Sequence, residues 1–179
     1  MLRLVLLGAD TQLGSSLCAE CPQGPAGCCV APPEIDFSDV GRIVTHGGRD
    51  FLLEHIAKKN LIPSAKGLRI RRVKRRESKT EPLERKCVFH GKDGCTIETT
   101  KRPATCNYFL CEDTFRKGAP EDQKRARDAH QTLRTFFARV DDDLLQSIQR
   151  IFPEGPPWNA QFLDWLGESF AQQNNAKIP

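Results

Sequence analysis

Residues 87–111 form the stretch CVFHGKDGCTIETTKRPATCNYFLC, and its cysteines are the clearest signal in the chain. The spacing is C-x7-C-x10-C-x4-C, and the turn signal Gly91-Lys-Asp-Gly94 lies between the first two cysteines. Glycine and aspartate at such a turn predict short strands on either side rather than a helix. The cysteines of this second group are Cys87, Cys95, Cys106 and Cys111.

A first group of cysteines lies further towards the N-terminus, in the stretch CAECPQGPAGCC of residues 18–29. Its members are Cys18, Cys21, Cys28 and Cys29, spaced C-x2-C-x6-C-C. Proline and glycine recur through residues 22–33, so an irregular loop is expected there. All eight cysteines of the chain therefore precede residue 112. Buried cysteines that only fill a core would be scattered among helices and strands instead.

Clustered thiolates on turns are typical of metal sites, because three or four sulfurs must converge on one ion. Eight cysteines allow two four-sulfur sites, one polynuclear cluster, or one four-sulfur site and a redox pair. The adjacent Cys28 and Cys29 have diverging side chains, which favours their division between two centres. Zinc and iron–sulfur clusters both suit all-sulfur ligation. His90 is a further candidate ligand, and structural disulfides, a thiol redox switch and unrelated buried thiols remain alternatives.

The composition indicates a globular protein in a reducing compartment. The chain has 179 residues, of which 39% are hydrophobic and 28% charged, and its net charge of +4 does not by itself imply nucleic acid. The apolar run before Gly8 is short for a signal peptide, and no stretch approaches the ~20 apolar residues of a membrane span. We therefore expect a cytoplasmic protein, where clustered cysteines more often serve metal or redox chemistry than disulfides.

The hydrophobic pattern before residue 112 predicts two short helices followed by short strands. A first helix begins at Asp36 or Ser38 and ends at the glycine pair 47–48, and a second covers 49–58. A turn is expected over 63–67. Strands over 68–76 and 84–90 would pair as a hairpin around a turn at 78–82, with a third short strand from Cys95 onwards.

The pattern after residue 112 is helical. An apolar stripe with steps of three or four predicts a helix over 120–152, with a possible interruption at the aspartates 141–143. A last helix is expected over 158–170, followed by a frayed polar tail. The stripe is expected to pack on the fold or to offer a docking face for a partner, through Leu133, Phe136, Phe137 and Val140.

These elements predict an α+β protein. Residues 1–115 would form a small, irregular, cysteine-rich metal-binding domain with short strands. Residues 116–179 would form a helical C-terminal extension that packs on this domain or docks beside it.

Residues 18–111 resemble the YkgJ-type cysteine-cluster family, whose members are described as zinc- or iron-chelating proteins. The most specific part of the resemblance is Arg102-Pro103 followed by Cys106, Phe109 and Cys111. The order of the cysteines and most of their spacings also match, whereas residues 112–179 have no counterpart in the family pattern.

The resemblance implies that all eight cysteines are the metal ligands. It also implies that Arg42, Arg102, Pro103 and either Asp39 or Asp36 support the site from behind the ligands. Two residues depart from the family pattern, since Glu98 replaces its usual tyrosine and Asn107 its usual arginine. These departures leave ligation possible but weaken any inference of a shared reaction.

The leading functional hypothesis is a metal-binding protein that holds zinc or an iron–sulfur or other iron centre and acts with a partner protein. An iron–sulfur-dependent redox or protein-modifying enzyme is the alternative, and no catalytic residue or further cofactor site can be assigned. A weaker alternative is a nucleic-acid-associated protein that uses the basic run 69–79, in which no aromatic residue offers stacking. No P-loop or dinucleotide fingerprint is present.

Overall fold

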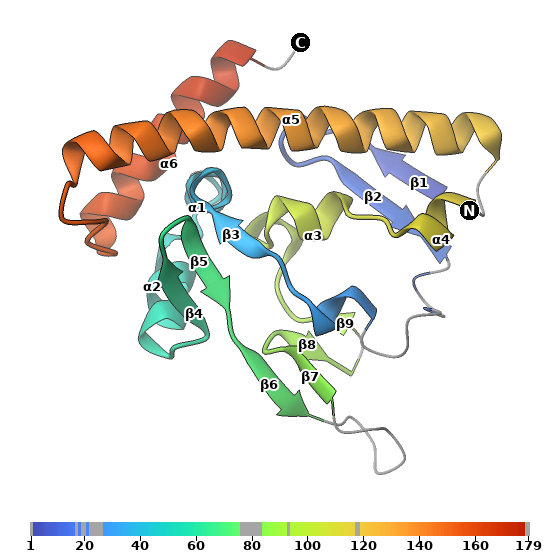
Figure 1. Cartoon of the computed structure of the whole chain (residues 1–179), viewed down its shortest axis with the longest axis horizontal. Coiled ribbons are helices and arrows are strands. Elements are labelled where there is room, and N and C mark those ends of the chain that lie inside the picture. Colours follow the sequence, from blue (N-terminus) through green and yellow to red (C-terminus); the bar gives the residue numbers. More distant parts are fainter. Residues whose placement is uncertain are drawn as a thin grey trace.

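The structure is a computed structural model, and it describes residues 2–16, 18, 21, 27–75, 84–92, 94–116 and 119–177. Within these residues, helices combine with small antiparallel sheets, which confirms the predicted α+β class. Figure 1 shows the long helix α5 (Pro120–Ile151) along one side of the molecule, with the two strands of residues 2–15 near it and the strands of residues 72–95 furthest from it. Helix α6 (Ala160–Lys177) crosses α5 obliquely.

The helices predicted between residues 36 and 58 are present. Helix α1 (Phe37–Thr45) ends at the glycine pair 47–48, and α2 (Arg49–Ala57) follows directly. The side chain of Asp36, at the N-cap position, makes no capping hydrogen bond. Instead, Asp141 of α5 accepts the backbone N–H of Ser38 with an N–O distance of 2.7 Å. The first turn of α1 is therefore capped from a distant helix.

Helices α1 and α6 approach closely because both carry glycine where they cross. A Cβ atom on Gly41 would lie 2.6 Å from Cβ of Phe170 and 2.9 Å from the carbonyl oxygen of Leu166. A Cβ atom on Gly167 would lie 2.7 Å from a methyl carbon of Val44. Side chains at either position would separate the two helices, so these glycines set the distance between them.

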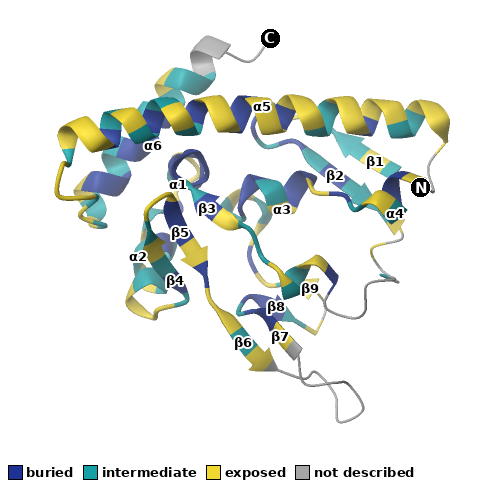
Figure 2. Ribbon diagram, in the orientation of Figure 1, coloured by how far each residue is buried: buried dark blue, intermediate teal, exposed yellow. Residues whose placement is uncertain are grey.

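The apolar stripe of α5 lies in the core, and its use as a docking face was the wrong interpretation. Its four named members are all buried, with Val140 at 0% exposure: Leu133, Phe136, Phe137 and Val140. Figure 2 shows the alternation of buried and exposed positions along α5. The ring of Phe137 stacks on Tyr108 of α3 (Ala104–Tyr108), with centroids 6.0 Å apart.

Two predicted helix limits were wrong. Helix α5 continues through the aspartates 141–143, because Asp141 is used by α1 and Asp142 lies exposed to water. Helix α6 extends to Lys177, beyond the predicted end at 170, so the expected frayed tail is helical over most of its length. Asn159 caps the start of α6 by accepting the N–H of Phe162 at 2.9 Å.

The strands form four small antiparallel sheets, three of which have only two strands. The three-stranded sheet has the order β3 (Glu34–Asp36), β5 (Gly67–Ile70), β4 (Leu61–Ser64). The two-stranded sheets pair β1 (Leu2–Val5) with β2 (Gln12–Ser15), β6 (Arg72–Arg75) with β7 (Glu84–Cys87), and β8 (His90–Gly91) with β9 (Gly94–Cys95).

The predicted strand 68–76 is divided at Arg71 between two sheets. The N–H of Arg71 donates to the carbonyl of Asn60, and its own carbonyl accepts the N–H of Val88. The pairing of this segment with the strand that begins at Glu84 is confirmed for β6 and β7, whereas the predicted turn at 78–82 lies outside the described residues. The turn expected over 63–67 is confirmed at Ala65 and Lys66, which join β4 to β5. Pro63 itself lies in β4, an edge strand, where a missing N–H is tolerated.

Short elements complete the fold around the cysteines. Two 3₁₀ turns cover Gly27–Val30 (η2) and Thr99–Lys101 (η3), and helix α4 covers Glu112–Arg116. Strand β7 contacts η2, and α3 contacts β2, so segments from both cysteine groups are neighbours. None of the described helices is both long and apolar enough to cross a membrane.

Candidate metal centre

All eight cysteines lie on short elements or in the segments between them. In the first group, Cys18 and Cys21 follow β2, and Cys28 and Cys29 lie in η2. In the second group, Cys87 and Cys95 end β7 and β9, Cys106 lies in α3, and Cys111 immediately precedes α4. None of the eight forms a disulfide, so all are available as thiols or thiolates.

Cys29 of the first group interacts with two thiols of the second. A hydrogen bond between the Cys28 and Cys29 side chains lowers the pKa of Cys28 and raises that of Cys29. Burial and the charges of Cys28, Cys87 and Cys95 raise the pKa of Cys29 further. The contact between η2 and β7 brings Cys28 and Cys29 near Cys87, and charges that are partly buried interact more strongly than charges in water.

Cys106 belongs to the same neighbourhood. Although much of this residue is accessible to water, the protein around its thiol raises the pKa, and the charges of Asp39, Cys95, Cys28 and Cys87 raise it further. The pKa of Cys87 is likewise raised by burial and then by the charges of Cys95 and Cys28. Placing several thiolates together is unfavourable without a cation, which is the electrostatic condition that a metal ion relieves.

A second neighbourhood surrounds Cys18. Partial burial raises the pKa of its thiol, and the charges of Cys111, Cys21 and Cys28 raise it further. The sulfur of Cys21 lies against Gly27, 3.1 Å from the position that a Cβ atom would occupy there. Cys111 is held by a 3.2 Å contact between its sulfur and the hydroxyl of Thr114. Cys28 thus interacts with members of both neighbourhoods.

The thiols are neighbours, but they do not yet surround a common point. Within the described part of the chain, no three histidine, cysteine or acidic side chains form a group that could hold a metal ion as it stands. Ligation would therefore require their side chains to turn inward. The donor set itself, eight cysteines without a disulfide, fits zinc or an iron–sulfur cluster.

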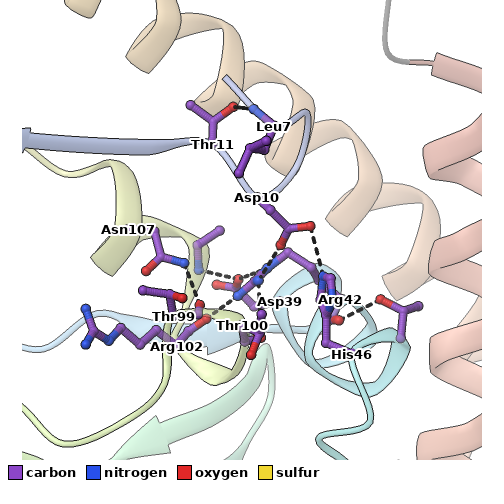
Figure 3. Close-up of polar contacts among 12 residues, drawn as sticks. Leu7, Asp10, Thr11, Asp39, Arg42, His46, Thr99, Thr100, Arg102 and Asn107 are labelled. Carbon is purple, nitrogen blue, oxygen red and sulfur yellow. Dashed lines mark hydrogen bonds and ion pairs between the residues drawn. The ribbon is translucent and has the colours of Figure 1, made fainter. Parts of the chain in front are cut away.

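Arg42, one of the residues that the family resemblance pointed to, is the centre of a buried polar network (Figure 3). Its guanidinium is 1% exposed and lies 2.9 Å from the Asp10 carboxylate and 3.6 Å from that of Asp39. It also donates to the carbonyls of Thr100 and Arg102. Arg42 therefore ties α1 to the segment that leads into Cys106.

Asp39 holds the same segment from the other side. Its carboxylate accepts the N–H of Ala104 at 2.5 Å, at the start of α3, which carries Cys106. Burial raises the pKa of Asp39 to about 6, although the charge of Arg42 opposes the shift. Asp36, the alternative to Asp39, lies outside this network and interacts with Asp141 instead. Asp39 and Arg42 thus position the backbone around the second cysteine group.

Arg102 and Pro103 act on the backbone and not on sulfur. The Arg102 guanidinium donates to the carbonyls of Ile97 (2.6 Å) and Cys95 (3.4 Å), which brings β9 and α3 together. Pro103 is the N-cap residue of α3, and its carbonyl accepts the N–H of Cys106. Asn107, where the family pattern has arginine, donates to the carbonyl of Thr99 at 2.8 Å.

The sequence analysis missed Asp10 as part of this network. Asp10 lies in the turn between β1 and β2, and its second carboxylate oxygen lies 2.9 Å from the His46 ring. Because Asp10 and Arg42 are 32 residues apart, no local pattern links them. The contact of Asp10 with Arg42 holds the β1–β2 hairpin against α1. Strand β2 precedes Cys18 in the sequence, so this contact also bears on the first cysteine group. His90, the other candidate ligand, is buried in β8 and pairs with Cys95 across the β8–β9 ladder.

No protein-family model matches this sequence, and no significant match was found among curated proteins or solved structures. The resemblance to the YkgJ-type family therefore stays a prediction that depends on the motif residues alone.

Proposed function

We propose that this chain is a metal-binding protein that holds zinc or an iron–sulfur centre through its two cysteine groups and acts with a partner protein. The observation that carries the proposal is the contact of η2, which holds Cys28 and Cys29, with β7, which ends at Cys87. There the pKa of Cys29 is raised by its hydrogen bond with Cys28 and by burial, and further by the charges of Cys87 and Cys95. Thiols gathered from segments so far apart in sequence are best explained by a shared cation. A reducing compartment such as the cytoplasm is part of the proposal, because free thiols persist there.

The two neighbourhoods suggest how the ligands divide. One centre would be held by Cys29, Cys87, Cys95 and Cys106, and the other by Cys18, Cys21, Cys28 and Cys111. Each set has four thiolates, the number that a structural zinc site or an iron–sulfur cluster uses. Cys28 and Cys29, whose side chains hydrogen-bond to each other in η2, would turn apart to face different centres. The bound metal would neutralise thiolate charge and connect short elements that share little core.

The first experiment is elemental analysis combined with an absorption spectrum of protein that is produced and purified without oxygen. Zinc gives colourless protein, whereas an iron–sulfur cluster gives brown protein that absorbs in the visible range. An iron–sulfur result would strengthen the alternative of a redox or protein-modifying enzyme. Fully reduced, metal-free protein that cannot be loaded with either metal would overturn the proposal.

The division of ligands has its own test. Cys106→Ser should remove metal from one centre and leave the other loaded, and Cys111→Ser should do the reverse. Each variant should therefore keep about half of the wild-type metal content. The double variant should keep none. Complete loss of metal in either single variant would indicate one shared polynuclear cluster instead of two centres.

A further inference from the structure

The ribbon formed by β6 and β7 carries positive charge on one face. In the β6–β7 register, Arg72 lies opposite Cys87 and Lys74 lies opposite Arg85. Residues that face each other across an antiparallel pair point to the same side, and so do residues two apart along a strand. Arg72, Lys74 and Arg85 therefore share one face, which we call the cationic face.

The two sides of the ribbon differ in exposure. The three side chains of the cationic face are all exposed. On the opposite face, Lys86 is buried and Val73 is half-buried. Cys87 shares the face of the cations but is buried where β7 ends, so the part of this face that is open to solvent is the part that carries the three cations. In Figure 1 the ribbon lies at the end of the molecule away from α5.

The cations of this face have no acidic partner among the residues that the structure describes. Within the described part of the chain, no ion pair involves Arg72, Lys74 or Arg85. Among the described residues, the one side-chain hydrogen bond made by these three cations is long, 3.4 Å from the Arg72 guanidinium to the carbonyl of Arg85. Some exposed arginines elsewhere are paired, such as Arg127 with Glu112 at 2.8 Å. Others, such as Arg125 and Arg139 of α5, have no ion pair with any described residue. The cationic face therefore keeps its charge available for an external anion.

The shape and composition of the ribbon favour duplex DNA among polyanions. The major groove of B-form DNA is wide enough to admit a two-stranded β-ribbon. No aromatic residue lies in β6 or β7, so the stacking on which single-strand binding depends is missing. Arginine and lysine side chains at alternate positions are the groups that neutralise phosphates along a strand.

From these observations we propose that the β6–β7 ribbon is a binding surface for the phosphate backbone of double-stranded DNA. The proposal goes beyond the metal-binding function and depends on the exposed cations alone. Binding is electrostatic and independent of base sequence. With three phosphates neutralised, the affinity falls about 40-fold between about 50 and 200 mM salt.

The test measures fluorescence anisotropy of a labelled, mixed-sequence DNA duplex with the full chain at both salt concentrations. The wild type should bind at low salt with a micromolar Kd. The variant R72Q/K74Q/R85Q should lose this salt-dependent binding. The control R125Q/R139Q/R150Q removes the same charge from exposed positions of α5 and should bind like the wild type. The single variant K74Q should make the salt dependence shallower by about one phosphate contact.

Circular dichroism and metal content of each variant separate loss of this surface from loss of fold or metal. The absence of duplex binding by the wild type at low salt would overturn the proposal. Equal weakening in the α5 control would do the same, because net charge would then explain the binding. A single strand of the same sequence, or polyglutamate, bound as tightly as the duplex would also overturn it.

Discussion

The helices α1, α5 and α6 and the strands β6 to β9 are stabilised in different ways. The helices share residues at 0% exposure, namely Val40, Ile43, Val140, Leu144, Leu163 and Leu166. Aromatic rings add to this core where α5 meets α6, as with Phe152 and Phe162, 5.3 Å apart. The strands form separate two-stranded ribbons, which are marginal by themselves in water. The helices are therefore stabilised by the hydrophobic effect, whereas the β6 to β9 region contributes fewer side chains to this core, such as Cys87 and Phe89, and would gain more from a cross-link.

Metal removal should produce the largest difference in stability between the helices and the strands. We expect a chelator to expose the backbone amides of β6 to β9 and η2 to hydrogen exchange and to leave those of α1, α5 and α6 protected. Structural zinc contributes on the order of 10 kcal/mol of apparent free energy in small zinc-finger peptides, so this effect should be the largest. Hydrogen-exchange mass spectrometry with and without chelator measures it region by region.

Loss of protection in the helices and the strands together would contradict this expectation, because the two regions would then unfold as one unit. The expectation would also fail if the chelated protein kept the protection of β6 to β9, since the ribbons would then be stable without metal. Adding zinc or iron back to the chelated protein is the control for damage by the chelator.

The close crossing of α1 and α6 should be the most sensitive point of the helical region. Gly41→Ala places a methyl group where only 2.6 Å separates it from Phe170. Overpacking of this kind costs about 1–3 kcal/mol, and alanine regains up to ~1 kcal/mol through its higher helix propensity. We expect a net loss of about 2 kcal/mol in the free energy of unfolding, measured from urea denaturation.

Gly14→Ala is the matched control, because no atom lies within 4 Å of the added carbon. It should change the free energy of unfolding by less than about 0.5 kcal/mol. A neutral effect of Gly41→Ala would mean that α6 can shift away from α1 without loss, and the core would then be less tightly packed than the crossing suggests.

The contact between α5 and the start of α1 should depend on pH. Burial, together with the charges of Asp36 and Asp39, raises the pKa of Asp141 from 3.8 to about 7, although the hydrogen bond from Ser38 opposes the shift. The folded state then holds a proton that the unfolded chain releases near pH 4. The stability that this proton contributes is complete below about pH 4 and is lost as the pH rises through about 7.

Asp141→Asn should remove this dependence while its amide oxygen still accepts the Ser38 N–H. Between pH 5 and 7, we expect the free energy of unfolding of the wild type to fall by about 1 kcal/mol more than that of the variant. This value is reduced because Asp141 is partly exposed to water. Urea denaturation at the two pH values measures the difference. Asp142→Asn, at an exposed neighbour, should keep the wild-type dependence, and the same slope in Asp141→Asn would assign the pH effect to other groups.

Several helix limits followed from local signals in the sequence. The glycine pair 47–48 ends α1, Pro120 begins α5, and Pro153 follows its end, since these residues restrict the backbone wherever they occur. The limits that failed depended on distant partners. The aspartates 141–143 resemble a helix break until α1 is seen to use Asp141.

The candidate site likewise combines features that local sequence predicts with features that depend on distant residues. The types and spacing of the eight cysteines predict metal chemistry without any coordinates, because thiolates suit few other uses in such number. Only the fold could show which thiols are neighbours, that Asp10 joins Arg42 across 32 residues, and that Arg72 and Lys74 share an exposed face with Arg85. Ligand type and backbone restriction are properties of single residues and short segments, and the sequence states them directly. Proximity between distant residues arises when the whole core packs, so it was decided by the tertiary structure.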